Sequence, residues 1–172
     1  SNTSFRVKNE QALHFWKSRF EKFNVPHDSI IERFGRKTLY FEDFEGARLM
    51  LVVDNGAGIP YGEAWVREEI SADNAIVGLG PVKLTVRKLA PTEKVLTEIL
   101  GFELAGSYPS EVLDMPDIQV YTTGKGGPGG EVHIETRTDL PMERPGRGSV
   151  HHVAFRIPTM EDYPKWEERL RE

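Results

Sequence analysis

The sequence contains no cysteine among its 172 residues, so disulfide bonds and thiolate chemistry are excluded. It also has no apolar run near the ~20 residues that a membrane-spanning helix needs. Its 22 Lys and Arg are outnumbered by 27 Asp and Glu, and no basic run is interleaved with aromatic residues. We therefore expect a protein of the reducing cytoplasm that binds neither membranes nor nucleic acid.

A repeat is present along the chain, and internal repeats decide architecture before local propensity does. The stretch FRVKNEQALHFWKSRFE from Phe5 aligns without gaps with FRIPTMEDYPKWEERLR from Phe155, matching a Phe, an Arg, a Trp and a second Arg. A weaker third copy, VKLTVRKLAPTEKVLTEILGF, begins at Val82. The repeat predicts several copies of one structural unit.

Each copy opens with alternating apolar and polar residues, typical of a strand, and continues at helical spacing. The first two copies then provide three further strand-like segments, so we predict an α+β fold of repeated βαβββ units, two complete and a third begun. The predicted boundaries are a first unit at 1–54, a connector at 55–75, a second unit at 76–136, a connector at 137–148, and the opening strand and helix of a further unit at 149–172.

The stretch GSVHHVAFRI places two adjacent histidines, His151 and His152, at the start of the last predicted strand. Successive strand residues point to opposite faces, so both cannot line one site. His152 shares the face of Ala154 and Arg156, which suits a polar site better than the apolar face of His151. Imidazole binds divalent metals together with further His or carboxylate ligands. A metal ligand and a hydrogen-bonded sheet histidine both remain open for this position.

His133 is a second candidate, because it shares one predicted strand face with Glu131 and Glu135. The alternative is a solvated or hydrogen-bonded strand face, which is the commoner role of such residues. The nearby stretch GKGGPGG lacks the Lys-Ser/Thr of a phosphate-binding loop and indicates a hairpin turn instead.

Several stretches together resemble the vicinal oxygen chelate superfamily of glyoxalases and extradiol dioxygenases, and in particular its hydroquinone-type ring-cleaving dioxygenases. These stretches are IERFGRKTLYFEDFEGARLMLV, GLGPVKLTV, VLTEILGF and PGRGSVHHVAFRI. Such proteins have four units, so the resemblance implies that this chain is a central fragment containing units two and three and the start of unit four. The absence of a start methionine in SNTSFRV agrees with a natural protein that begins earlier.

The resemblance implies a non-haem Fe(II)-dependent dioxygenase, or one that uses Mn(II), that cleaves hydroquinone- or catechol-like aromatics with O2. It implies that His152 is a metal ligand, that His151 lies beside it, and that the other ligands lie outside this chain. The fragment alone is then expected to be inactive and to hold no metal stably. The corresponding ligand positions of the two complete units hold Asn2, Met50, Pro81 and His133.

Two other functions are compatible with the same residues. One is a glyoxalase-like metal-dependent isomerase or lyase, and the other is a metal-free module that binds a small molecule. In every case an unfinished third unit exposes apolar residues such as Phe155 and Trp166, so we expect a homo-oligomer or association with the missing units.

Overall fold

The computed structural model describes residues 1–141, 152–157 and 159–171. The first part of the chain forms β1 (Thr3–Val7), α1 (Glu10–Phe23), β2 (Ile31–Arg33), β3 (Arg36–Glu42), β4 (Arg48–Val53) and β5 (Ile76–Leu79). The second part forms β6 (Val82–Val86), α2 (Leu89–Lys94), the π-helical turn η1 (Val95–Ile99), β7 (Glu103–Tyr108), β8 (Ile118–Thr122), the 3₁₀ turn η2 (Pro128–Gly130), β9 (Glu131–Thr136) and α3 (Tyr163–Arg169). The predicted α+β class with βαβββ units is confirmed.

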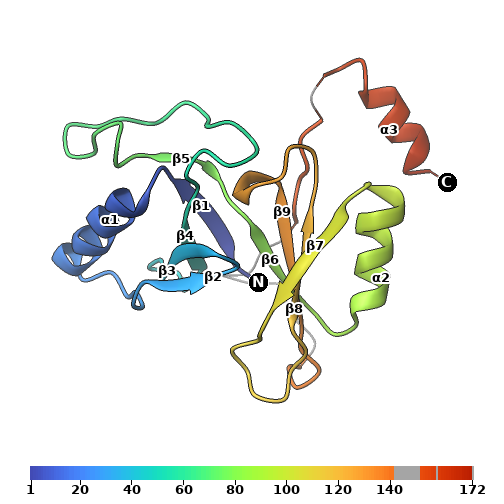
Figure 1. Cartoon of the computed structure of the whole chain (residues 1–172), viewed down its shortest axis with the longest axis horizontal. Helices are drawn as coiled ribbons and strands as arrows, with labels where there is room; N and C mark the ends of the chain where they lie inside the picture. The colour runs from blue at the N-terminus through green and yellow to red at the C-terminus, as the bar shows by residue number, and fades with distance from the viewer. Residues whose placement is uncertain (142–151, 158, 172) are drawn as a thin grey trace.

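The strands form two sheets with the orders β2-β3-β4-β1-β5 and β6-β9-β8-β7. In each unit the opening strand runs parallel to the last strand, so β1 pairs with β4 and β6 pairs with β9. The other neighbouring strands are antiparallel. Figure 1 shows the two sheets side by side, with α1 outside the first and α2 outside the second.

The alternation of each strand places its apolar residues under the helix of its own unit. In the first unit, Leu13 and Phe20 of α1 pack with Val7, Leu39 and Leu51. Asn9 caps this helix by accepting a hydrogen bond from the backbone N–H of Ala12 at 2.9 Å. At the end of this helix Phe23 is exposed.

The second unit repeats this arrangement with η1 continuing α2. Leu96 and Phe102 pack with Tyr121, Val132 and Ile134, which cover the helix side of β8 and β9. The helical segment ends before Gly101, whose φ of +72° is the left-handed conformation typical of the residue that follows a helix C-terminus.

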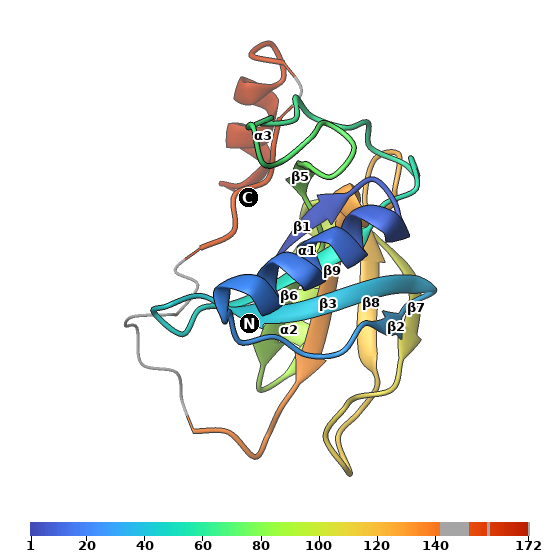
Figure 2. The same ribbon diagram turned by 90° about the vertical axis from the view of Figure 1, so that its left-hand side faces the viewer.

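The opposite faces of the two sheets meet each other. The sheets are joined at one edge, where Asn2 and Lys83 exchange two backbone hydrogen bonds of 2.9 and 3.1 Å. Figure 2 shows α1 in front of β1 and β3, with the strands of the second sheet behind them. We call the layer of side chains between the sheets the inner layer, and it includes the buried apolar residues Met50, Val52, Ile118 and Val120.

Two parts of the chain differ from the sequence prediction. The strand β5, within the range assigned to the second unit, pairs with β1 of the first sheet instead. Residues 152–157 do not form the predicted strand, because in the complete units the opening strand pairs with the last strand, and no described residue supplies that partner here. The segment packs on the second unit, with Phe155 edge-on to Phe102 at 5.3 Å. The predicted helix that follows is present as α3.

A close approach between the first connector and the β8–β9 hairpin depends on glycine. A Cβ at Gly58 would lie 1.9 Å from the carbonyl oxygen of Gly126, and Gly58 has a φ of +73°. We expect Gly58→Ala to lower the free energy of unfolding by about 2 kcal/mol or more, because it combines a left-handed backbone with a clash against backbone atoms. Urea unfolding measures this loss.

The matched control is Gly46→Ala, which has a similar φ of +80° and no atom within 4 Å of the added Cβ. Gly46→Ala should lower the free energy of unfolding by about 1 kcal/mol, because it adds a side chain in the left-handed backbone conformation without a clash. Equal losses in the two variants would contradict the close approach.

Candidate functional site

Most of the buried polar side chains belong to the inner layer between the two sheets. A polar group removed from water needs a partner, so such a layer requires matched donors, acceptors and charges. The buried polar and charged residues are Asn2, Ser4, Arg6, Thr38, Asp54, Glu131, His133 and Glu135. The inner layer is therefore the candidate site to examine.

Arg36 and Glu131 form an ion pair that joins the two units. Arg36 at the start of β3 donates from Nη1 and Nη2 to the two carboxylate oxygens of Glu131 on β9, each at 2.8 Å. The Glu131 side chain is only 4% exposed and that of Arg36 is 21% exposed. Burial raises the pKa of Glu131, but hydrogen bonds from His133 and Arg36 outweigh it and leave this pKa below its ordinary value. A bidentate pair also fixes the relative orientation of its partners.

His133 continues this network toward β7. Its Nε2 lies 3.2 Å from Glu131 and its Nδ1 lies 3.1 Å from the hydroxyl of Tyr108. Both contacts are satisfied when Nε2–H donates to the carboxylate and Nδ1 accepts from the phenol. Burial also raises the pKa of Tyr108, so its hydroxyl keeps its proton as a donor. The predicted shared face of Glu131, His133 and Glu135 is confirmed, and it is buried and hydrogen-bonded rather than solvated.

A second group of polar residues lies further along β9. Glu135 accepts a hydrogen bond from Thr85 at 3.0 Å and lies 3.9 Å from Nζ of Lys83. The same Nζ is 5.8 Å from the ring centre of Tyr40, whose pKa is raised to about 12, chiefly by burial. Each of the two glutamates on this face thus has a cationic partner, Arg36 for one and Lys83 for the other.

These residues do not fit a metal site. Within residues 1–141, 152–157 and 159–171, no group of three His, Cys, Asp or Glu side chains is placed to hold a metal ion. Both oxygens of Glu131 are already bound by the Arg36 guanidinium, which occupies the side of the carboxylate that a metal would need. Met50, at a position expected to correspond to a ligand, is an apolar residue of the inner layer.

His152 is not among the residues of this network. His152 is exposed, and among the described residues no two further His, Asp or Glu side chains are placed to bind a metal ion together with it. His151 lies outside the described residues, so the arrangement of the pair stays a prediction. His14, on α1, is exposed with a side-chain exposure of 61%.

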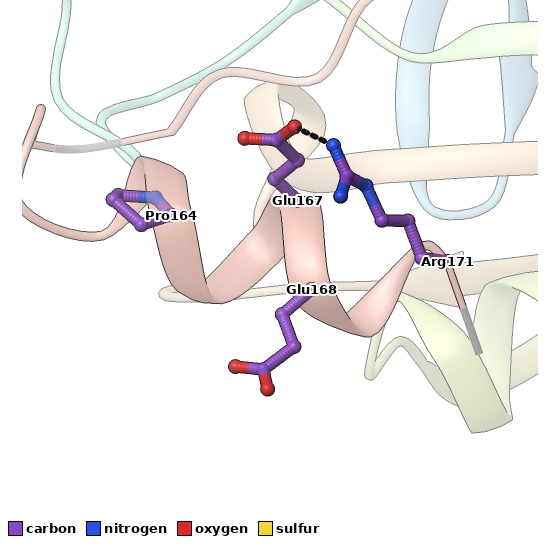
Figure 3. A pocket seen from close by; sticks show the side chains of 4 residues that line it. All are labelled: Pro164, Glu167, Glu168 and Arg171. Carbon is purple, nitrogen blue, oxygen red and sulfur yellow. Dashed lines mark hydrogen bonds and ion pairs between the residues drawn. The ribbon is translucent and has the colours of Figure 1, made fainter.

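The surface of the described residues includes a hollow along α3 and a smaller one between the two units. The larger, about 560 Å³, is lined by Pro164, Glu167 and Glu168 of α3 and by Arg171, which follows the end of this helix. Figure 3 shows Glu167 paired with Arg171 while Glu168 points the other way, so this hollow lies along one exposed helix and does not involve the inner layer. The smaller, about 260 Å³, lies where the two units meet near Phe34 and Tyr108.

Sequence reasoning missed Arg36 and Tyr108 as parts of the network. No local signal identifies a partner 95 residues away, such as Glu131 for Arg36. The repeated order of strands indicates which strand faces could lie between the two sheets, but it does not indicate which side chains pair.

The buried ion pair predicts a pH dependence of stability. In the folded protein the pKa of Glu131 lies below its ordinary value of 4.5. The ionised Glu131 side chain therefore contributes fully to the free energy of unfolding above pH 4.5, and this contribution is lost as pH falls through the folded pKa. We expect the difference in unfolding free energy between the wild type and Glu131→Gln to be largest near pH 7 and to shrink below pH 4.5. Urea unfolding at several pH values measures it, with exposed Glu103→Gln as the control. A difference that does not change with pH would contradict this assignment.

Comparison with solved structures identifies the fold. A crystal structure of a candidate dioxygenase from Bacillus subtilis is 32% identical and superposes with a TM-score of 0.78, covering 99% of this chain and 50% of that one. Glyoxalase I from Zea mays has the same fold at 11% identity, with a TM-score of 0.53 over 81% of this chain and 43% of that one. With its paired βαβββ units, the chain has the fold of the glyoxalases and of the vicinal oxygen chelate superfamily.

In sequence, the chain is similar to MhqA of Bacillus subtilis strain 168, named as a candidate ring-cleaving dioxygenase. The two are 44% identical over 169 residues, which cover 96% of this chain and 52% of MhqA. The chain thus spans about half the length of the curated relatives it matches. No protein-family model matches the sequence. Among the described residues, no helix is both long and apolar enough to cross a membrane.

Proposed function

We propose that this chain works as part of a ring-cleaving dioxygenase that acts with O2 on hydroquinone- or catechol-like aromatics. The observation that carries the proposal is the 44% identity to MhqA across 96% of the chain. An identity of this size across a nearly complete pair of units supports a shared activity more strongly than the fold does, because one fold serves many reactions.

In this proposal His152 is a ligand of a catalytic metal, Fe(II) or Mn(II), and His151 is its neighbour. Imidazole is a suitable ligand for both metals, and two histidines with one carboxylate are typical of non-haem iron oxygenases. The described residues do not complete such a set. The remaining ligands are therefore expected from parts of a longer protein, which also fits a chain that spans half of its relatives.

The two described units then have a supporting role. Their inner layer already pairs Glu131 with Arg36 and Glu135 with Lys83, so its charges are matched internally. In a longer protein, these two units would accompany the units that hold the metal. We also propose that copies of the protein associate.

Oxygen uptake by the full-length protein tests the proposal. We expect consumption of O2 with hydroquinone or catechol after loading with Fe(II), and its loss with a chelator. An isomerase or lyase of the same superfamily would convert its substrate without consuming O2, and that result would overturn the assignment. The 172-residue chain alone is the negative control.

A further inference from the structure

The hollow of about 260 Å³ between the two units differs in character from the rest of the surface. It is lined by Glu32, Arg33 and Phe34 of the first unit and by Tyr108, Pro109, Ser110 and Glu111 of the second. It therefore exists only because the two units pack together, and it shares Tyr108 with the network around His133.

Phe34 is an unusual residue for its position. It forms a two-residue turn with Gly35 between the paired residues Arg33 and Arg36, and both turn residues have positive φ, 46° and 72°. This turn type favours Asn, Asp or Gly at its first central position, and a bulky residue there is strained. Strain of this kind is retained where the side chain has a use elsewhere in the structure.

The ring of Phe34 forms an aromatic wall with the second unit. Its centre lies 6.3 Å from that of Tyr108 and 6.2 Å from that of His133. Gly106 of β7 leaves room for it, because a Cβ there would lie 3.3 Å from the Phe34 ring. The wall is thus held in place from behind and presents aromatic surface to the hollow.

The charges around the hollow cancel. Arg33 donates from Nε to Glu111 at 3.0 Å, and Glu32 lies 3.6 Å from Nζ of Lys37. A charged ligand would find no unmatched partner, whereas a hydroxyl group can donate to the rim carboxylates without disturbing the pairs. The volume lies just below the range usual for drug-sized ligands and suits a single ring.

We propose that this hollow binds a neutral single-ring aromatic alcohol, a phenol or quinol, against Phe34 and Tyr108, without metal and without reaction. The ring packs against the aromatic wall, and a hydroxyl donates to Glu111. His152, the proposed metal ligand, does not line this hollow. The proposal of a phenol site therefore does not depend on the proposed ring cleavage.

NMR titration of the 172-residue chain with phenol, in the presence of a chelator, tests the site. With few ligand atoms, a dissociation constant on the order of 1 mM is expected. Chemical-shift changes should concentrate at Phe34, Tyr108 and Ser110. Cyclohexanol, with the hydroxyl but no aromatic ring, should bind at least 10-fold more weakly. Shifts that are absent or lie elsewhere, or equal binding of the two alcohols, would overturn the proposal.

Two variants separate binding from folding. Phe34→Asn removes the ring and places a residue favoured in this turn, so the fold should persist while phenol affinity falls at least 10-fold. Phe44→Asn is the matched control, because Phe44 is 98% exposed, and should bind as the wild type does. Glu111→Gln, on the rim, should weaken binding about 3-fold. Unchanged phenol affinity in both Phe34→Asn and Glu111→Gln would contradict the site. Because the titration uses neither metal nor O2, this result would leave the proposed dioxygenase activity untouched.

Discussion

The His152→Ala variant of the full-length protein is expected to lose both its bound metal and its O2 uptake. Loss of a residue that only supports a metal ligand costs roughly 10- to 100-fold in metal affinity or activity, so loss of a ligand itself should exceed 100-fold. Metal content by mass spectrometry and O2 uptake with hydroquinone measure the two effects separately. A loss of activity with full metal content would instead assign His152 to substrate binding.

His14→Ala is the matched control for this experiment, because His14 is an exposed histidine on α1, far along the chain from the pair. It should keep wild-type metal content and activity. Wild-type metal content and activity in His152→Ala as well would exclude this histidine as a ligand and remove the main residue on which the proposed site depends.

Replacing Arg36 by alanine is expected to lower the free energy of unfolding by about 3 kcal/mol, since it leaves the Glu131 carboxylate buried without its cation. For a chain of this size the midpoint of thermal unfolding should fall by about 6 °C or more. Thermal unfolding followed by circular dichroism and urea unfolding measure the loss.

Arg48→Ala provides the control, because Arg48 is an exposed arginine on β4 of the same sheet. Its cost should stay near 0.5 kcal/mol. The double variant Arg36→Met with Glu131→Gln removes both charges and should be more stable than Arg36→Ala alone, because the largest cost is the unpaired buried charge. If Arg36→Ala cost no more than Arg48→Ala, the pair would contribute little to joining the units.

Local patterns predicted much of this fold because strand and helix periodicities act over short distances. The alternation in GEVHIET places Glu131 and His133 on one face and Val132 and Ile134 on the other, as the structure shows. The repeat supplied the order of elements in both units.

Features that depend on distant partners could not be predicted. The pairing of Arg36 with Glu131 requires knowledge of how two sheets meet, and nothing near Arg36 encodes it. Phe34 and Gly35 lack the Asn-Gly pattern typical of their turn, so the hairpin gave no local signal. The segment 152–157 has strand-like alternation but forms no strand, because a strand also needs a neighbour to pair with.

The cross-unit pair of Arg36 and Glu131 also has a consequence for dividing the chain. If the two units were produced as separate polypeptides, one would carry an unmatched guanidinium and the other an unmatched carboxylate at the surface where they join. Opposite charges at such a surface speed the encounter of two halves and make it sensitive to ionic strength. The repeated units have thus become complementary rather than interchangeable, and two copies of the same half could not reproduce this contact.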